Sequence, residues 1–213
     1  IELLNKYNRL VCKINKVSGG GSVYRVSNQF ELEKAAHQIF GHSSTMAVCP
    51  FYEIESEFRI IVLNDTIKLI YSKIIPFVEG NGVSTIRQLL LSYMLEHPDY
   101  NIRNFYIPED DNSIVLEKGK RFDLNWKHNL SQGATSLIIE DTQVIKDLSD
   151  LALRAASAIN IEFASVDIIK TKDKYLIMEI NSGSMIEHFS QVNESNYTIA
   201  KGIYADAIKS MFK

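Results

Sequence analysis

The sequence has few of the features that mark extracellular or membrane proteins. It contains two cysteines, Cys12 and Cys49, each inside an apolar run. This favours two reduced core residues over a disulfide scaffold or a catalytic thiol. No apolar run reaches the roughly 18 residues that a transmembrane helix needs, and no secretory signal is recognisable. We therefore expect a cytoplasmic protein that does not span a membrane.

An excess of basic charge is also missing. Lysine and arginine number 23 against 26 aspartates and glutamates, giving a formal net charge of −3, so no basic field indicates a nucleic-acid partner. The sequence shows no Ser-His-Asp or Cys-His set for nucleophilic catalysis. A hydrophobic content of 46% is sufficient for one or two domains with a real core. Because the chain begins at Ile1 rather than methionine, we expect a piece of a longer protein.

The order of predicted elements divides the chain into two lobes. Residues 1–54 predict a small lobe of strands with one helix, and residues 55–213 predict a large lobe that contains two long hairpins. The strands of these hairpins are predicted at residues 57–63 and 67–77 and at residues 164–169 and 175–180. Two long helices, residues 142–160 and 195–211, carry apolar stripes.

Three oxygen-bearing side chains interrupt the apolar strands of the second hairpin: Asp167, Glu179 and Asn181. If the strands pair about residue 172, Asp167 lies close to Glu179, and Glu179 shares a face with Asn181 two residues later. Carboxylate and amide oxygens are suitable ligands for Mg²⁺. The alternative is a solvated hairpin face, but the apolar flanks favour a metal site because buried carboxylates need partners.

A lysine and a glycine-rich loop near the N-terminus form a second candidate site. Lys13 lies within an apolar strand, and the loop Ser18-Gly19-Gly20-Gly21-Ser22 follows it. The backbone N–H groups of such a loop suit phosphate oxygens, although the loop lacks the Gly-Lys-Ser/Thr sequence and the helix of a Walker loop. Alone it is typical of a flexible turn; together with Lys13 it predicts a phosphate lid.

Charged residues of the first hairpin form a third candidate set. Glu57 and Arg59 share a strand face, and Lys73 lies on the partner strand. One hairpin register places Lys73 beside them, whereas a register shifted by one residue points its side chain to the other face of the sheet. The set is either a surface ion-pair ladder or a cluster in which Arg59 and Lys73 neutralise a transferring phosphoryl group. In the second case Glu57 could accept ribose hydroxyls.

Two loops leave similar alternatives open. Residues 127–134 are either an ordinary polar loop or a donor-rich part of a site. His188, seven residues after Asn181, is either a helix-end surface residue or a contact for a substrate carboxylate.

Taken together, these residues resemble the ATP-grasp superfamily, and within it the ATP-grasp domains of cyanophycin synthetase and bifunctional glutathione synthetase. The resemblance is carried by the order of strand lysine, glycine-rich lid and Glu-Phe-Arg strand, and by the twelve-residue gap from Asp167 to Glu179 with its Glu-x-Asn pair. Residues 73–89, 129–134 and 181–188 also carry it. It implies an α+β ATP-grasp fold whose two lobes, with antiparallel sheets, enclose the nucleotide.

The resemblance further implies an ATP-dependent, ADP-forming ligase that joins a carboxylate to the amine of an amino acid or peptide through an acyl phosphate. An ATP-binding module without ligase activity and a kinase on the same fold are the alternatives. The implied cofactors are ATP and Mg²⁺, as two ions, with Mn²⁺ as a substitute. The implied partners are a small amino acid or peptide and an upstream domain of the same protein. Whether the protein forms a homo-oligomer is left open.

Site roles follow from the same resemblance. The residues implied to bind ATP are Lys13, Ser18, Gly19, Gly20, Gly21, Ser22, Phe51, Tyr52, Glu57 and Met178. Those implied to bind Mg²⁺ are Asp167, Glu179 and Asn181. Those implied to face the γ-phosphate and the substrate carboxylate are Arg59, Lys73 and Asn129. Those implied to contact substrate are Ser182, Gly183, Ser184 and His188. The sequence Ser182-Gly183-Ser184 replaces the small-Pro-Gly run of relatives, which leaves substrate choice open.

Overall fold

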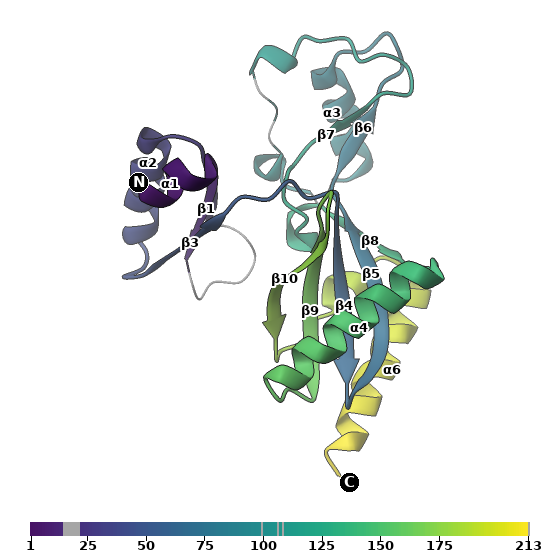
Figure 1. Cartoon of the computed structure of the whole chain (residues 1–213). Coiled ribbons are helices and arrows are strands. Elements are labelled where there is room, and N and C mark those ends of the chain that lie inside the picture. The colour runs from purple at the N-terminus through teal and green to yellow at the C-terminus, as the bar shows by residue number, and fades with distance from the viewer. Residues whose placement is uncertain (15–21, 99, 106, 108, 213) are drawn as a thin grey trace. The chain divides into compact units, whose positions relative to one another are not determined.

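The computed structural model describes residues 1–14, 22–98, 100–105, 107 and 109–212. The chain divides into two compact units, Ile1–Glu53 and Ile54–Lys213, and each has its own hydrophobic core (Figure 1). Among the helices of the described residues, none combines the length and the apolar character needed to cross a membrane.

The first unit is a three-stranded antiparallel sheet with two helices on one face (Figure 1). Its elements are α1 (Glu2–Tyr7), β1 (Leu10–Ile14), β2 (Val23–Val26), α2 (Gln29–Phe40) and β3 (Met46–Pro50). Asn28 begins α2, because its side chain accepts a hydrogen bond from the backbone N–H of Glu31 (2.9 Å). The buried core comprises Leu4, Leu10, Cys12, Val26, Ala35 and Ile39.

The two cysteines have different environments, although the sequence predicts a core position for both. Cys12 is buried on β1, and burial, which is the main cause, raises the pKa of its thiol. Cys49 is exposed on β3, so the prediction for this residue is wrong. Successive side chains of a strand point to opposite faces, and the helices cover only the face that contains Cys12. Both thiols are free.

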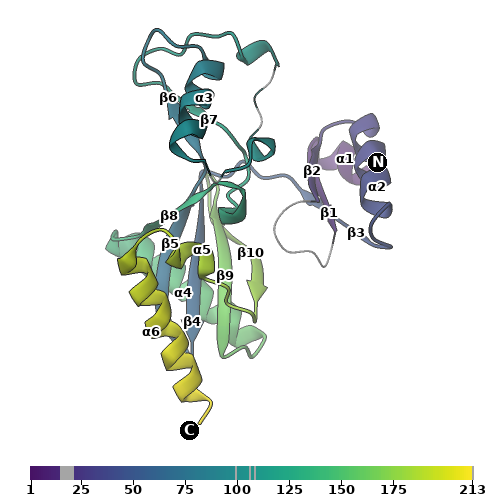
Figure 2. The ribbon, with the colours of Figure 1, turned by 180° about the vertical axis from the view of Figure 1, so that it is seen from behind.

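The second unit is built on a five-stranded antiparallel sheet with the strand order β10-β9-β4-β5-β8. Its strands are β4 (Ser56–Leu63), β5 (Thr66–Ile74), β8 (Thr135–Ile138), β9 (Phe163–Lys170) and β10 (Tyr175–Asn181). Helix α4 (Thr142–Ala158) covers one face, and α5 (Glu187–Ser190) with α6 (Glu194–Ser210) covers the other (Figures 1 and 2). In this strand order, β4 is the central strand of the sheet.

Alternation along β4 explains why both faces are covered. Phe58, Ile60 and Val62 pack with α4, whereas Ile61 packs with α5 and α6. Helix α4 begins after Asp141, whose carboxylate accepts hydrogen bonds from two backbone N–H groups of the first turn. The two helical layers bury most of the inner strands β4, β5 and β9, whereas the edge strand β10 stays partly exposed.

A smaller two-stranded sheet extends the second unit. It consists of β6 (Phe77–Glu79) and β7 (Arg121–Asp123) and packs with α3 (Ile86–Glu96). Its own core contains Val78, Ile86, Leu90, Leu116 and Leu124. Gly80 is required at the end of β6, because a Cβ atom there would lie 2.0 Å from the carbonyl oxygen of Glu117. The intervening 3₁₀ helices are η1 (Ile102–Asn104) and η2 (Glu109–Asp111).

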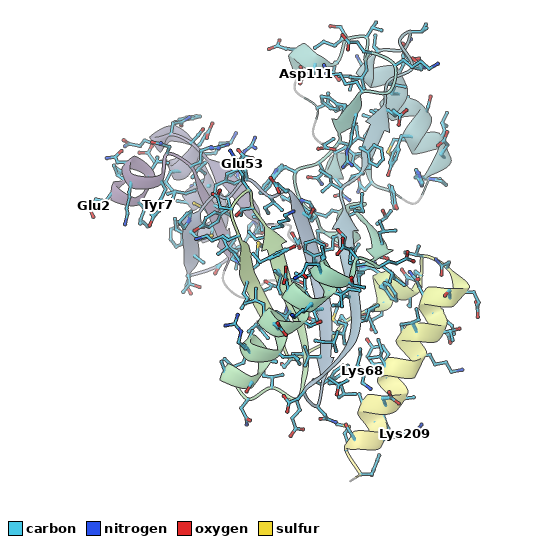
Figure 3. All side chains as sticks on the ribbon, turned by 45° about the vertical axis from the view of Figure 1, so that its right-hand side comes forward. Glu2, Tyr7, Glu53, Lys68, Asp111 and Lys209 are labelled. Carbon is cyan, nitrogen blue, oxygen red and sulfur yellow. The ribbon has the colours of Figure 1, made fainter. Side chains whose placement is uncertain are left out.

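The β4–β5 hairpin contains a β-bulge that changes its register. Val62 pairs with Ile67, but Ile61 pairs with Leu69, so Lys68 is an extra residue on β5. Lys68 lies beside α6 (Figure 3), where its amino group donates a hydrogen bond to the carboxylate of Asp206 (3.0 Å). The extra residue reverses the direction of the side chains that follow it on β5. Each of them points to the opposite face of the sheet from the one it would have without the bulge.

We expect the substitution Leu148→Ala in α4 to lower the free energy of unfolding by roughly 3 kcal/mol, because it leaves a cavity in the core. Leu148 is fully buried, whereas Leu95 of α3 is 84% exposed. The matched control Leu95→Ala should change stability by less than about 0.5 kcal/mol. Urea unfolding followed by the fluorescence of Trp126 measures both, and equal losses would contradict the packing described for α4.

Candidate active site

Five charged side chains come together on the face of the large sheet that α5 and α6 partly cover. Glu57 lies opposite Lys73, Arg59 opposite Asp167, and Asp167 opposite Glu179. Because directly opposed residues of an antiparallel pair point to the same face, all five project to one side. Residues far apart in the sequence, on four adjacent strands, thus form one cluster.

Two β-bulges make this arrangement possible. The Lys68 bulge brings Lys73 opposite Glu57, and a second bulge, between Ile177 and Glu179, brings Glu179 opposite Asp167. Without the extra residue in each strand, Lys73 and Glu179 would project to the α4 face.

The four residues of β4, β5 and β9 form a continuous ion-pair network. Arg59 donates two hydrogen bonds to Asp167, from Nε to Oδ1 and from Nη2 to Oδ2, both 2.7 Å long. The Nζ atom of Lys73 donates to Asp167 Oδ2 at 2.8 Å and to Glu57 Oε1 at 2.6 Å. Glu57, Lys73 and Asp167 are each less than 9% exposed. Two carboxylates and two cations therefore compensate each other in a largely dry environment.

The ionisation of these groups reflects that network. Burial alone would raise the pKa of Asp167, but the hydrogen bonds and charges of Arg59 and Lys73 outweigh it, and the pKa is lowered. Burial would lower the pKa of Arg59, yet the hydrogen bond and the charge of Asp167 raise it. Tyr71, opposite Arg59 on β5, is fully buried, and burial is the main cause that raises its pKa to about 12. Asp167 and Arg59 are therefore both charged near neutral pH.

Glu179 and Asn181 extend the network with further oxygen atoms. The Nδ2 atom of Asn181 donates to Glu179 Oε1 at 2.7 Å, and Glu179 is exposed. With Asp167 opposite Glu179, the three side chains supply only carboxylate and amide oxygens, a donor set that fits a hard cation such as Mg²⁺. Among the described residues no group of three His, Cys, Asp or Glu suits a metal ion. A cation here would therefore need the Asn181 oxygen and non-protein oxygens to complete its shell.

Asn129 and its neighbour His128 lie in the segment between β7 and β8, and His128 contacts the end of β5. Asn129 caps η3 (Leu130–Gln132), and its Oδ1 atom accepts hydrogen bonds from the backbone N–H and the hydroxyl of Ser131. The amide NH₂ group is thus the part of Asn129 suited to donate to a ligand. His128 Nδ1 lies 2.8 Å from the carbonyl oxygen of Lys73. His128 was not predicted from the sequence, and its place in a donor-rich loop was the available signal.

Tyr71 was not predicted either. Its side chain faces the network, two residues before Lys73, and its hydroxyl has no hydrogen-bond partner among the described residues. Tyr71 and Lys73 are two residues apart on one strand, and this spacing places their side chains on the same face. An aromatic residue in a strand is, however, usually interpreted as part of the core.

Three of the predicted substrate residues, Ser182, Gly183 and Ser184, lie between β10 and α5. Ser184 is buried, and its carbonyl oxygen accepts a hydrogen bond from the Tyr204 hydroxyl at 2.8 Å. Gly183 and His188 are exposed, and His188 lies in the last turn of the short helix α5. Within the part of the chain that the structure describes, Ser182, Gly183, Ser184 and His188 make no ion pair or hydrogen bond with the network. Their substrate role stays a prediction.

The remaining predicted nucleotide residues belong mainly to the first unit. Lys13 is half-buried on β1, between Val23 and Ala47. Ser18, Gly19, Gly20 and Gly21 lie outside the described residues, and Ser22 directly precedes β2. Their role in phosphate binding is therefore not tested by the structure.

Three aromatic or apolar residues were predicted to line an adenine slot. Two guanidinium groups lie over the ring of Phe51. The Cζ atoms of Arg9 and Arg25 are 4.9 Å and 5.6 Å from the ring centroid. Tyr52 follows it and is 44% exposed. Met178, in the second unit, is the extra residue of the β10 bulge and is 46% exposed. Their role in an adenine slot stays a prediction.

The RimK-like ATP-grasp domain matches residues 78–205, more than half of the chain. The chain belongs to this family. It is 30% identical over 120 residues to a tetrahydromethanopterin:alpha-L-glutamate ligase of Methanocaldococcus jannaschii, covering 56% of this chain and 38% of that protein. It is 24% identical over 205 residues to the glutathione biosynthesis bifunctional protein GshAB of Listeria innocua, covering 81% and 25%.

Solved structures show the same fold. The D-alanine–D-alanine ligase of Bacillus anthracis complexed with ATP matches with a TM-score of 0.54 at 15% identity, covering 85% of this chain and 45% of that one. A bifunctional glutathione synthetase of Pasteurella multocida matches with a TM-score of 0.53 at 16% identity, covering 96% and 32%. The predicted α+β ATP-grasp fold is confirmed. The chain spans between 25% and 45% of the length of these proteins.

We expect Asp167→Asn to lower the free energy of unfolding by roughly 3 kcal/mol at pH 7, because it leaves Arg59 and Lys73 with a single carboxylate. The pKa of Asp167 is lower in the folded chain than its ordinary value of 3.8. Its contribution is therefore fully present above 3.8 and is lost as the pH falls through the lowered folded value. The difference between wild type and variant should shrink below about pH 4.

Chemical unfolding between pH 7 and pH 3, without divalent cations, measures this difference. The matched control Asp173→Asn, in the exposed β9–β10 turn, should cost less than about 0.5 kcal/mol at every pH. A loss for Asp167→Asn that does not depend on pH would contradict the role of its charge.

Proposed function

We propose that this chain is the ATP-grasp domain of an ATP-dependent ligase that joins a carboxylate to the amine of an amino acid or peptide. The observation that carries the proposal is the buried network of Glu57, Arg59, Lys73 and Asp167, beside which the hydrogen-bonded pair Glu179 and Asn181 lies, with Glu179 opposite Asp167. Membership of the RimK-like ATP-grasp family supports the proposal, as does the likeness to a protein named as a glutamate ligase. Because the chain spans less than half of that protein, the activity is proposed for the full-length molecule.

The proposed reaction has two steps. An oxygen of the substrate carboxylate attacks the γ-phosphorus of ATP, the bond to the β–γ bridging oxygen breaks, and ADP leaves with an acyl phosphate formed. The amine nitrogen then attacks the acyl carbon, the C–O bond to phosphate breaks, and the amine loses a proton. The products are an amide, ADP and inorganic phosphate. Such phosphoryl transfer depends on positioning and on charge neutralisation rather than on a protein nucleophile.

The residues of the cluster suit these tasks. Arg59 and Lys73 are fixed cations that can donate hydrogen bonds to phosphoryl oxygens. Asp167, Glu179 and Asn181 would hold Mg²⁺, as two ions, with Mn²⁺ as a substitute, and the bound metal would supply charge neutralisation for the transferring phosphoryl group. The amide of Asn129 would donate to the substrate carboxylate. Lys13, the loop of residues 18–22, Phe51, Tyr52 and Met178 would bind the nucleotide.

We expect Glu179→Gln to reduce ATP turnover by about 10²-fold or more, because it removes the charge of an exposed oxygen donor whose loss should leave the fold intact. Phosphate release by the full-length protein, measured against a panel of amino acids and dipeptides, tests this. Trapping with hydroxylamine detects the acyl phosphate. The control Glu96→Gln, at the exposed end of α3, should retain wild-type turnover.

The outcomes separate this proposal from its alternatives. Wild-type turnover by Glu179→Gln would refute the metal site. Stabilisation by Mg-ATP without any substrate-stimulated phosphate release would show a binding module, and a phosphorylated product without amide formation would show a kinase.

A further inference from the structure

Glu57 has surroundings that do not fit a residue that contacts the nucleotide sugar. It lies on the central strand β4, between Lys73 of β5 on one side and Ile169 of β9 on the other. Its side chain is 10% exposed, and that of Lys73 is 5% exposed. A ribose acceptor must offer its oxygens to a ligand, whereas one Glu57 oxygen receives the ammonium group of Lys73 at 2.6 Å.

We infer that Glu57 is a positioning residue that holds the Lys73 ammonium group for catalysis, rather than a ribose-binding residue. The inference rests on the proposed function and assigns Glu57 a different task within that site. It requires that the carboxylate acts through Lys73, so the contacts and charges around that lysine are decisive.

The geometry of Lys73 supports this assignment. An ammonium group has three N–H donors and no acceptor, and two of the three are used, by Glu57 Oε1 and Asp167 Oδ2. The acceptors come from two different strands, β4 and β9. Two fixed acceptors determine the direction of the third donor, which can then meet a phosphoryl oxygen without a search through rotamers. With one acceptor the long lysine side chain would regain rotational freedom.

Charge balance supports it as well. The cations Arg59 and Lys73 face the carboxylates Glu57 and Asp167 in a buried environment. Removing the charge of Glu57 leaves two cations on Asp167 alone. Asp167 Oδ2 already accepts from both cations, so it cannot replace the lost acceptor without weakening its pair with Arg59. Loss of Glu57 should therefore displace Lys73 and lower kcat.

The decisive experiment is a double-mutant cycle in the full-length protein. Glu57→Gln should lower kcat by about 10- to 100-fold, as expected for a misplaced catalytic group, with a change in the KM for ATP of less than about 2-fold. In a Lys73→Gln background the same substitution should change kcat by less than about 2-fold, because its effect passes through Lys73. Equal losses in both backgrounds would overturn the inference.

A comparison of nucleotides provides an independent readout. We expect the ratio of kcat/KM between ATP and 2′-deoxy-ATP, and between ATP and 3′-deoxy-ATP, to be the same within about 2-fold in wild type and in Glu57→Gln. A ratio that falls to one in the variant, or a raised KM for ATP with unchanged kcat, would show that Glu57 binds ribose and would overturn the inference. The control Glu55→Gln, at an exposed residue just before β4, should match wild type in all of these values.

A conservative variant covers the case in which Glu57→Gln does not fold, which circular dichroism would show. Glu57→Asp keeps the charge but shortens the reach to Lys73, so it should lower kcat less than Lys73→Gln does and leave the ratios for the deoxynucleotides unchanged. An altered ratio in this variant would count against the inference. If the wild-type protein releases no phosphate with any substrate, the proposed function fails; if it is active and the cycle is additive, only the role of Glu57 fails.

Discussion

The carboxylate of Asp167, held by Arg59 and Lys73, is the interaction on which the rest of the site depends. A buried carboxylate is costly unless charges and hydrogen bonds compensate it. Here three N–H donors do so at 2.7 to 2.8 Å, and the pKa of Asp167 falls in spite of burial. The same contacts fix the positions of both cations. The charges that a phosphoryl group would meet are therefore in place as a consequence of folding.

The sheet allows this cluster because of a change in side-chain direction within two of its strands. One face of the sheet is an apolar core with α4. The other packs Ile61, Leu69 and Tyr71 against α5 and α6 and carries the charges beyond them. In a regular ladder without bulges, Lys73 and Glu179 would point to the face that packs against α4. The bulges at Lys68 and Met178 direct the side chains of Lys73 and Glu179 to the face that carries the other charges. Bulges occur frequently next to active sites.

The two ends of the site differ in how strongly the fold constrains them. The charged residues lie within paired strands: backbone hydrogen bonds hold β4, β5 and β9 on both sides, and the edge strand β10 on one side. Among the predicted substrate residues, Gly183 lies between β10 and α5 and His188 lies in α5, and both are exposed. Loops tolerate change in sequence more readily than strand interiors do. This agrees with the different names of two relatives, a tetrahydromethanopterin:alpha-L-glutamate ligase and a glutathione biosynthesis bifunctional protein.

The fold class and most members of the cluster follow from the amino-acid sequence alone. Apolar alternation predicts the strands, and a carboxylate inside such a strand is rare, so the sequence pattern is sufficient to single out Asp167 and Glu179. The burial of Cys12 but not Cys49, the contact of His128 with Lys73 and the pairing of Glu57 depend on register and on which face a helix covers. These features are settled by tertiary packing. The physical reason is the period of two in a β-strand: one extra residue, which leaves the sequence pattern almost unchanged, reverses the face of every side chain beyond it.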